Sequence, residues 1–173
     1  MSARLSHFRP RDENPISPWP DSSPPSYPEA VYVIGMRAVE NRIEYYFVEQ
    51  PDGTKKDGDA PLTIRVLKHT TIVLKLDPKW DWSFAADTAV VIGPVDHPEK
   101  GRYFNLKANS KGEVRFLAQY LDIGTGNADP YAIYLSVGQG VNKDGVDRRL
   151  LVRIDPDMLN PGDHDPPPPP PEH

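Results

Sequence analysis

The chain has 173 residues, the usual length of one domain, and its 20 lysines and arginines stand against 25 aspartates and glutamates. This acidic balance disfavours nucleic acids and anionic membranes as partners, because both attract a surplus of basic side chains. The absence of cysteine excludes disulfides, thiolate-bound metals and a cysteine nucleophile. No apolar run has the length of a secretory signal core or a membrane span, so we expect a cytoplasmic protein.

The first 28 residues are predicted to form an extended arm. Seven of the 21 prolines fall in this stretch, and proline removes a backbone donor and fixes φ, so neither a helix nor an inner strand can persist. The arm also carries apolar anchors that purely solvated linkers lack, among them Phe8, Ile16, Trp19 and Tyr27. We expect these anchors to dock on the surface of a neighbouring molecule.

Residues 29–160 are predicted to form one all-β domain. Alternating segments rich in β-branched and aromatic residues recur between turn signals, which is typical of a sandwich or a barrel. About nine strands are expected, at Ala30–Val39, Arg42–Glu49, Leu62–Leu67, His69–Leu76, Thr88–Ile92, Tyr103–Ala108, Glu113–Leu121, Tyr131–Val137 and Arg148–Ile154. The alternation favours an antiparallel β-sandwich of immunoglobulin-like or cupredoxin-like layout, with one solvated face on each sheet.

The same alternation predicts the core. Its expected members are Val31, Val33, Tyr45, Phe47, Ile64, Val66, Ile72, Leu74, Val91, Phe104, Phe116, Ile133, Leu135 and Leu151. No stretch keeps a helical apolar period for three turns, and Trp80–Ala86 is the one candidate for a short helical turn.

Residues 161–173 are predicted to form a separate tail. Its six consecutive prolines, Pro166–Pro171, favour a polyproline II rod of roughly 3.1 Å per residue. Asp163, Asp165 and Glu172 make the tail acidic on both sides of that rod. The tail is interpreted either as a ligand motif or as a solubilising extension.

No group of residues predicts catalysis or metal binding. The domain holds two histidines, His69 and His97, and no serine lies in a Gly-x-Ser-x-Gly elbow. Asp96, His97 and Glu99 could ligate a metal but lack a fourth ligand, and the loop Asn142–Asp147 has its glycine at the wrong place for an EF-hand. We therefore expect no enzyme, no cofactor and no metal.

Two tryptophans form the candidate ligand site. Trp80 and Trp82 alternate with Asp81 and Ser83, and indoles beside a carboxylate can stack a sugar ring. Tyr103 is a further candidate for this site. The alternative interpretation is that these rings belong to the core of the sandwich.

Two strands end in Asp-Pro corners, at Asp77-Pro78 and at Asp155-Pro156, and Asn160-Pro161-Gly162 follows the second corner. With these corners, residues 30–162 resemble the DP-EP family of uncharacterised bacterial β-rich proteins, although the chain contains no Glu-Pro dipeptide. The resemblance implies a compact β-sandwich, and it implies neither a reaction nor any functional residue.

The leading functional hypothesis is a non-catalytic structural or interaction domain. It would self-assemble into a homo-oligomer or filament, or dock another protein, through its arms and its sheet edges. The alternative is a carbohydrate or small-ligand binding module at Trp80 and Trp82. A metal-dependent enzyme using His69, His97 and Asp96 ranks below both, because no ligand spacing supports it.

Overall fold

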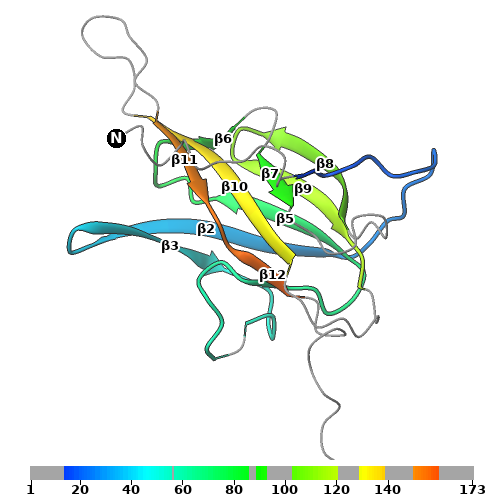
Figure 1. Cartoon of the computed structure of the whole chain (residues 1–173), viewed down its shortest axis with the longest axis horizontal. Coiled ribbons are helices and arrows are strands. Elements are labelled where there is room, and N and C mark those ends of the chain that lie inside the picture. Colours follow the sequence, from blue (N-terminus) through cyan, green and yellow to red (C-terminus); the bar gives the residue numbers. More distant parts are fainter. Residues whose placement is uncertain are drawn as a thin grey trace, which may run out of the picture.

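The computed structural model describes residues 14–55, 57–85, 89–92, 103–120, 129–138 and 150–159, which form two β-sheets (Figure 1). The first sheet has the order β1-β7-β10-β12-β4, with β6 and β11 also paired to β10, and the second has the order β3-β2-β5-β9-β8. The strands are β1 (Asn14–Pro15), β2 (Glu29–Val39), β3 (Arg42–Glu49), β4 (Ile64–Arg65), β5 (Thr70–Leu76), β6 (Trp82–Phe84), β7 (Val90–Ile92), β8 (Tyr103–Ser110), β9 (Glu113–Ala118), β10 (Asp129–Val137), β11 (Leu150–Ile154) and β12 (Asp157–Leu159).

The all-β prediction is confirmed for the described residues, and their two sheets are consistent with a β-sandwich. None of the described segments is a helix with the length and apolarity needed to cross a membrane. The helical turn predicted over Trp80–Ala86 is wrong, because Trp82 to Phe84 form β6 and pair with β10. The alternation of large and small residues there places both aromatic rings on the buried face, which one helical turn could not do.

The prediction of purely antiparallel pairing is also wrong, because β2 pairs with β5 in parallel and β12 pairs with β4 in parallel. The physical reason lies in the connection after β3. Residues 50–69 leave the second sheet, contribute β4 to the first sheet and return to the end where β2 begins, so that Thr71 faces Glu29. A connection that crosses to the other sheet allows the parallel pairing that a hairpin forbids.

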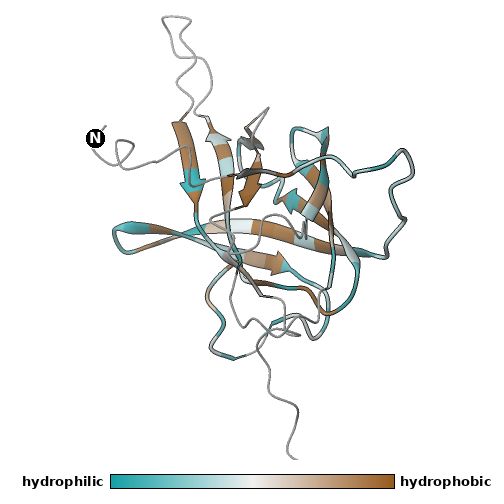
Figure 2. Ribbon diagram, turned by 45° about the vertical axis from the view of Figure 1, so that its right-hand side comes forward, coloured by the Kyte–Doolittle hydropathy of each residue, from teal (hydrophilic) through white to brown (hydrophobic). Residues whose placement is uncertain are grey.

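The core lies between the sheets and contains most of the residues predicted for it. Figure 2 shows the apolar residues concentrated along the strands and the hydrophilic ones in the connecting turns. The predicted core residues that are buried are Ile64, Val66, Ile72, Leu74, Val91, Phe116, Ile133 and Leu135. Tyr45, Phe47 and Phe104 are half-buried, and Leu151 is 57% exposed on β11.

The predicted face of β2 is wrong by one residue. Tyr32 and Ile34 are buried in the core, whereas Val31 and Val33 are half-buried on the other face. Odd- and even-numbered residues of this stretch are both apolar, so the alternation pattern does not indicate which set faces the core. The ring of Tyr32 packs against that of Phe47 on the neighbouring strand, with ring centroids 4.8 Å apart, and this contact places Tyr32 inside.

The proline-rich segment 14–28 packs on the sandwich in this structure. Its first residues form β1 and pair with β7 of the first sheet. Ser17 then bridges to β8 of the second sheet and accepts a 2.9 Å backbone hydrogen bond from Asn105. Trp19 continues the contact, because its backbone N–H donates to the Asn105 side chain and its ring meets Phe104 edge-on at 4.8 Å. This segment therefore joins the two sheets along one side of the sandwich.

Candidate functional site

A cavity of about 630 Å³ lies on the opposite side of the sandwich. It lies beside β3, and β3 and β8 are the two opposite edges of the second sheet. The facing wall comes from the segment before β4 and from the link between β11 and β12. Its lining residues are Arg37, Glu44, Tyr45, Tyr46, Phe47, Gln50, Lys55, Pro61, Leu62, Thr63, Ile154, Asp155 and Pro156.

Three consecutive aromatic residues of β3 line this cavity, and all three are half-buried. The ring of Tyr45 stacks near Trp82 with centroids 6.5 Å apart, and burial raises the pKa of the Tyr45 hydroxyl. Tyr46 lies over Gly35 of β2, where an added Cβ would come within 3.3 Å of the tyrosine ring and 2.5 Å of Val48. Because Gly35 has no side chain, the Tyr46 ring has room to lie over β2 at this position.

The charges of the cavity are mostly paired within the chain. Glu44 accepts from Arg37 at 3.0 Å and from Arg42 at 2.8 Å, and these two guanidinium groups lower the pKa of Glu44. Asp155 is paired with Arg153. Lys55, by contrast, has no ion-pair partner within the described part of the chain, so the lining leaves one positive charge available.

Hydrogen bonds fix the wall that faces β3. The hydroxyl of Tyr131 donates to the backbone carbonyl of Leu62 at 2.6 Å, and Leu62 itself has a positive φ of 61°. Arg65 donates to both carboxylate oxygens of Asp59, at 2.9 and 3.1 Å, and both side chains are largely buried. A bidentate pair of this kind holds the loop before β4 in one geometry, so this wall is preformed.

The structure does not bring Tyr103 to the two tryptophans of the predicted ligand site. Trp82 is buried, and its indole N–H donates to the carbonyl of Asp77 at 2.8 Å. Trp80 is half-buried, and the Lys79 ammonium lies 5.2 Å from the centre of its ring. Trp82 pairs with the end of β10, whereas Tyr103 donates to Asp129 at the start of β10, at 2.5 Å.

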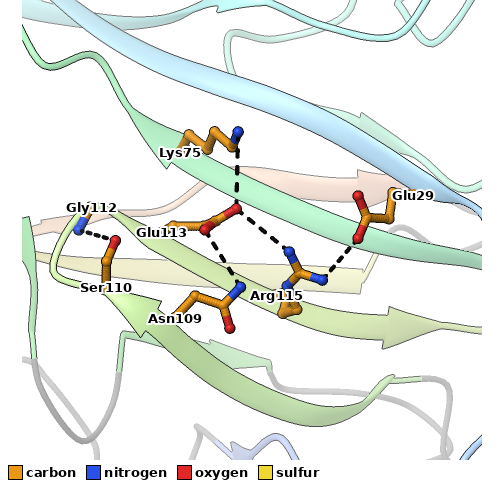
Figure 3. Close-up of polar contacts among 7 residues, drawn as sticks. All are labelled: Glu29, Lys75, Asn109, Ser110, Gly112, Glu113 and Arg115. Carbon is orange, nitrogen blue, oxygen red and sulfur yellow. Dashed lines mark hydrogen bonds and ion pairs between the residues drawn. The ribbon is translucent and has the colours of Figure 1, made fainter.

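The outer face of the second sheet carries a polar cluster, drawn in Figure 3, that consists of paired groups. Arg115 contacts Glu29 at 2.8 Å and Glu113 at 3.6 Å, and Lys75 lies 4.0 Å from Glu113. Asn109 is within hydrogen-bond distance of both Glu113 and Arg115. Two positive and two negative side chains balance one another here, so this cluster is a solvated cross-strand network, and two of its members, Glu29 and Arg115, also line a smaller pocket of about 250 Å³.

The remaining candidates of the sequence are dispersed. His69 is exposed, its Nδ1 accepts from the Tyr120 backbone, and its ring stacks on that of Tyr27 at 5.1 Å. Ile16 packs against the core. Phe8, Asp96, His97, the loop Asn142–Asp147 and the tail 161–173 lie outside the described residues. Among the residues that the structure describes, no group of three histidines, aspartates or glutamates could hold a metal ion.

The sequence interpretation assigned Tyr45 and Phe47 to the core, and both do pack against it half-buried, but it overlooked the cavity that they also line. The missed signal is the run Tyr45-Tyr46-Phe47, since three consecutive aromatic residues must place rings on both faces of one strand. No protein-family model, curated protein or solved structure matches this chain. The arrangement of the cavity therefore carries the functional argument.

Proposed function

We propose that this protein is a non-catalytic β-sandwich binding domain that holds an extended segment of a partner protein in the cavity beside β3. The observation that carries the proposal is the aromatic run of Tyr45, Tyr46 and Phe47 on an edge strand that lines a cavity of about 630 Å³. Sites that take small or extended ligands usually have this size and combine aromatic walls with a few polar groups.

Four polar side chains support the proposal. Tyr45, Tyr46, Gln50 and Lys55 all line the cavity, and none of these side chains makes a hydrogen bond or ion pair within the described structure. Each of them can donate a hydrogen bond. A ligand that offers several acceptors, such as the carbonyls of an extended backbone, would therefore find donors along the whole cavity.

Finer assignments remain proposals drawn from the sequence. They are an immunoglobulin-like or cupredoxin-like layout, membership of the DP-EP family, a cytoplasmic location and assembly through the arms. The second function considered is sugar binding at Trp80. The ammonium of Lys79 lies 5.2 Å from the centre of that ring, just as the guanidinium of Arg37 lies 5.1 Å from the centre of the Tyr46 ring, so a neighbouring cation does not distinguish the two sites. A glycan panel tests this second function, since dose-dependent binding that Trp80→Ala abolishes would replace the present proposal.

Selection of a displayed peptide library on the immobilised full-length protein tests the binding function. We expect peptides that bind the parent protein and lose at least tenfold in affinity against Tyr46→Ala. Tyr27→Ala is the matched control, because it removes an equally half-buried tyrosine on the opposite side of the sandwich. If no peptide is selected, or if selected peptides bind the Tyr46→Ala protein as well as the parent, the proposal is refuted, provided that circular dichroism shows both variants folded.

A further inference from the structure

The chemistry of the cavity indicates what kind of backbone it would bind. Proline contributes a carbonyl acceptor and no N–H donor, and a polyproline II segment makes no internal hydrogen bonds. The cavity offers the complementary set, because Tyr45, Tyr46, Gln50 and Lys55 can all donate. Aromatic-lined grooves are a recurrent way of binding such segments, whose extended unbound state has little conformational entropy to lose.

This chain contains a segment of that chemistry. We infer that the cavity beside β3 binds the proline-rich acidic segment 161–173 of a second copy of the protein, so that copies associate head to tail. The inference rests on the proposed function and names its partner. It follows from three features of the chain: the length of the proline run, the charge of its flanks and the position at which the chain leaves the sandwich.

The lengths are compatible. Pro166–Pro171 would span about 19 Å at the polyproline II rise of roughly 3.1 Å per residue. The cavity is lined along β3 and its continuation by Glu44, Tyr45, Tyr46, Phe47 and Gln50, within a stretch of seven residues that spans about 23 Å at roughly 3.3 Å per residue. A rod of six prolines is therefore long enough to pass all three aromatic residues of β3, which span about 10 Å.

The charges are complementary as well. Glu44 and Asp155 are already paired with arginines, which leaves Lys55 as the available charge of the lining. Asp163 and Asp165 precede the prolines, and Glu172 follows them. An acidic residue on either flank could thus pair with the exposed ammonium of Lys55, and this contact should weaken with salt.

The path of the chain favours a second copy as the source of the segment. Ile154, Asp155 and Pro156 line the cavity, and the chain has passed it when β12 ends at Leu159. β12 carries the described chain past the cavity, between β10 and β4, so a proline run further along is offered more directly by a second copy. A contact between two different surfaces of identical molecules propagates into chains or closes into rings.

Sedimentation of the full-length protein over a range of concentrations tests the association. We expect reversible oligomers for the parent protein and monomers for a variant in which all six residues Pro166–Pro171 are replaced by serine. Lys55→Glu should weaken the association roughly three- to tenfold, as expected for reversing one exposed charge at an interface. Lys111→Glu is the matched control, because it makes the same change at the β8–β9 turn, away from the cavity, and should leave the association unchanged.

A peptide titration identifies the binding surface. The synthetic peptide 160–173 is added to the six-serine variant, and we expect saturable binding with shifts of the backbone amide signals of β3 and of Ile154 and Asp155. A parent protein that stays monomeric at all concentrations, or an association that the six-serine variant retains, overturns the inference. If library peptides without prolines bind the cavity and the peptide 160–173 does not, the inference fails while the proposed binding function stands.

Discussion

Replacing Tyr32 by phenylalanine tests how one buried hydroxyl affects the free energy of unfolding. The side chain is 1% exposed, and its hydroxyl makes no well-formed hydrogen bond in the structure. Phenylalanine keeps the ring contact with Phe47 and removes only this oxygen. Because an unpaired buried polar group costs roughly 1–3 kcal/mol, Tyr32→Phe should leave the free energy of unfolding at pH 7 unchanged or raise it by up to that amount.

The same variant should alter the response to alkaline pH. Burial raises the pKa of Tyr32 to about 12, against a smaller opposite effect of the Thr54 side chain. An unfolded tyrosine titrates near pH ~10, so between these two values the unfolded state releases its proton first and the folded state loses stability as pH rises. The full loss is about 2.7 kcal/mol for two pKa units, and about half of it is present at pH ~11.

Urea unfolding followed by tryptophan fluorescence at pH 7, 9, 10 and 11 measures both effects. The parent protein should lose roughly 1.4 kcal/mol more than Tyr32→Phe between pH 9 and 11. Tyr45, whose pKa is also raised, is present in both proteins and cancels from the difference. Coincident alkaline slopes, or a Tyr32→Phe protein that is more than about 1 kcal/mol less stable at pH 7, would refute the reasoning.

Four further single substitutions and one double variant test the packing by urea unfolding at neutral pH. Phe116→Ala should lower the free energy of unfolding by about 3–5 kcal/mol, because the Phe116 ring is 1% exposed. Leu151→Ala should lower it by less than about 0.5 kcal/mol, because Leu151 is 57% exposed. Equal losses of stability would contradict the observed core. Tyr103→Phe should cost about 1–3 kcal/mol, since it removes a donor from the buried Asp129 carboxylate, and an unchanged stability would show that this hydrogen bond contributes nothing. Gly35→Ala should cost about 1–3 kcal/mol through overlap with Val48, and Val48→Ala in the same chain should recover part of that loss.

The sequence predicts strands best where one face is plainly apolar and the turns are short. The predicted strand Arg42–Glu49 has the bounds of β3, and the hairpin of β8 and β9 lies where alternation places it. Alternation fails at β2, where both parities are apolar, because the face is then chosen by the contact of Tyr32 with Phe47. It also fails at β6, whose three residues are too few to show a period.

The candidate site could be predicted only in part. The aromatic run on β3 is visible in the sequence, but its significance depends on the wall that faces it. That wall comes from Leu62 and its neighbours, before β4, and from the link at Ile154 to Pro156, between β11 and β12, so it adjoins strands of the other sheet. No local sequence pattern predicts that this wall faces β3. The two are brought together because residues 50–69 cross between the sheets and because β11 pairs beside β10.

The proline-rich segment 14–28 forms a seam along one side of the sandwich, where it joins the two sheets. This seam affects how the protein can fold during synthesis. Trp19 contacts Asn105, 86 residues later in the chain. At a synthesis rate of about 5–20 residues per second, this partner leaves the ribosome roughly 4–17 s after Trp19 does. During that interval the prolines prevent the segment from pairing as a regular strand, either with its own chain or with a neighbouring nascent one. The partner strands of the segment, β7 and β8, both precede β10, β11 and β12, so the seam can form before the strands that complete the first sheet have been synthesised.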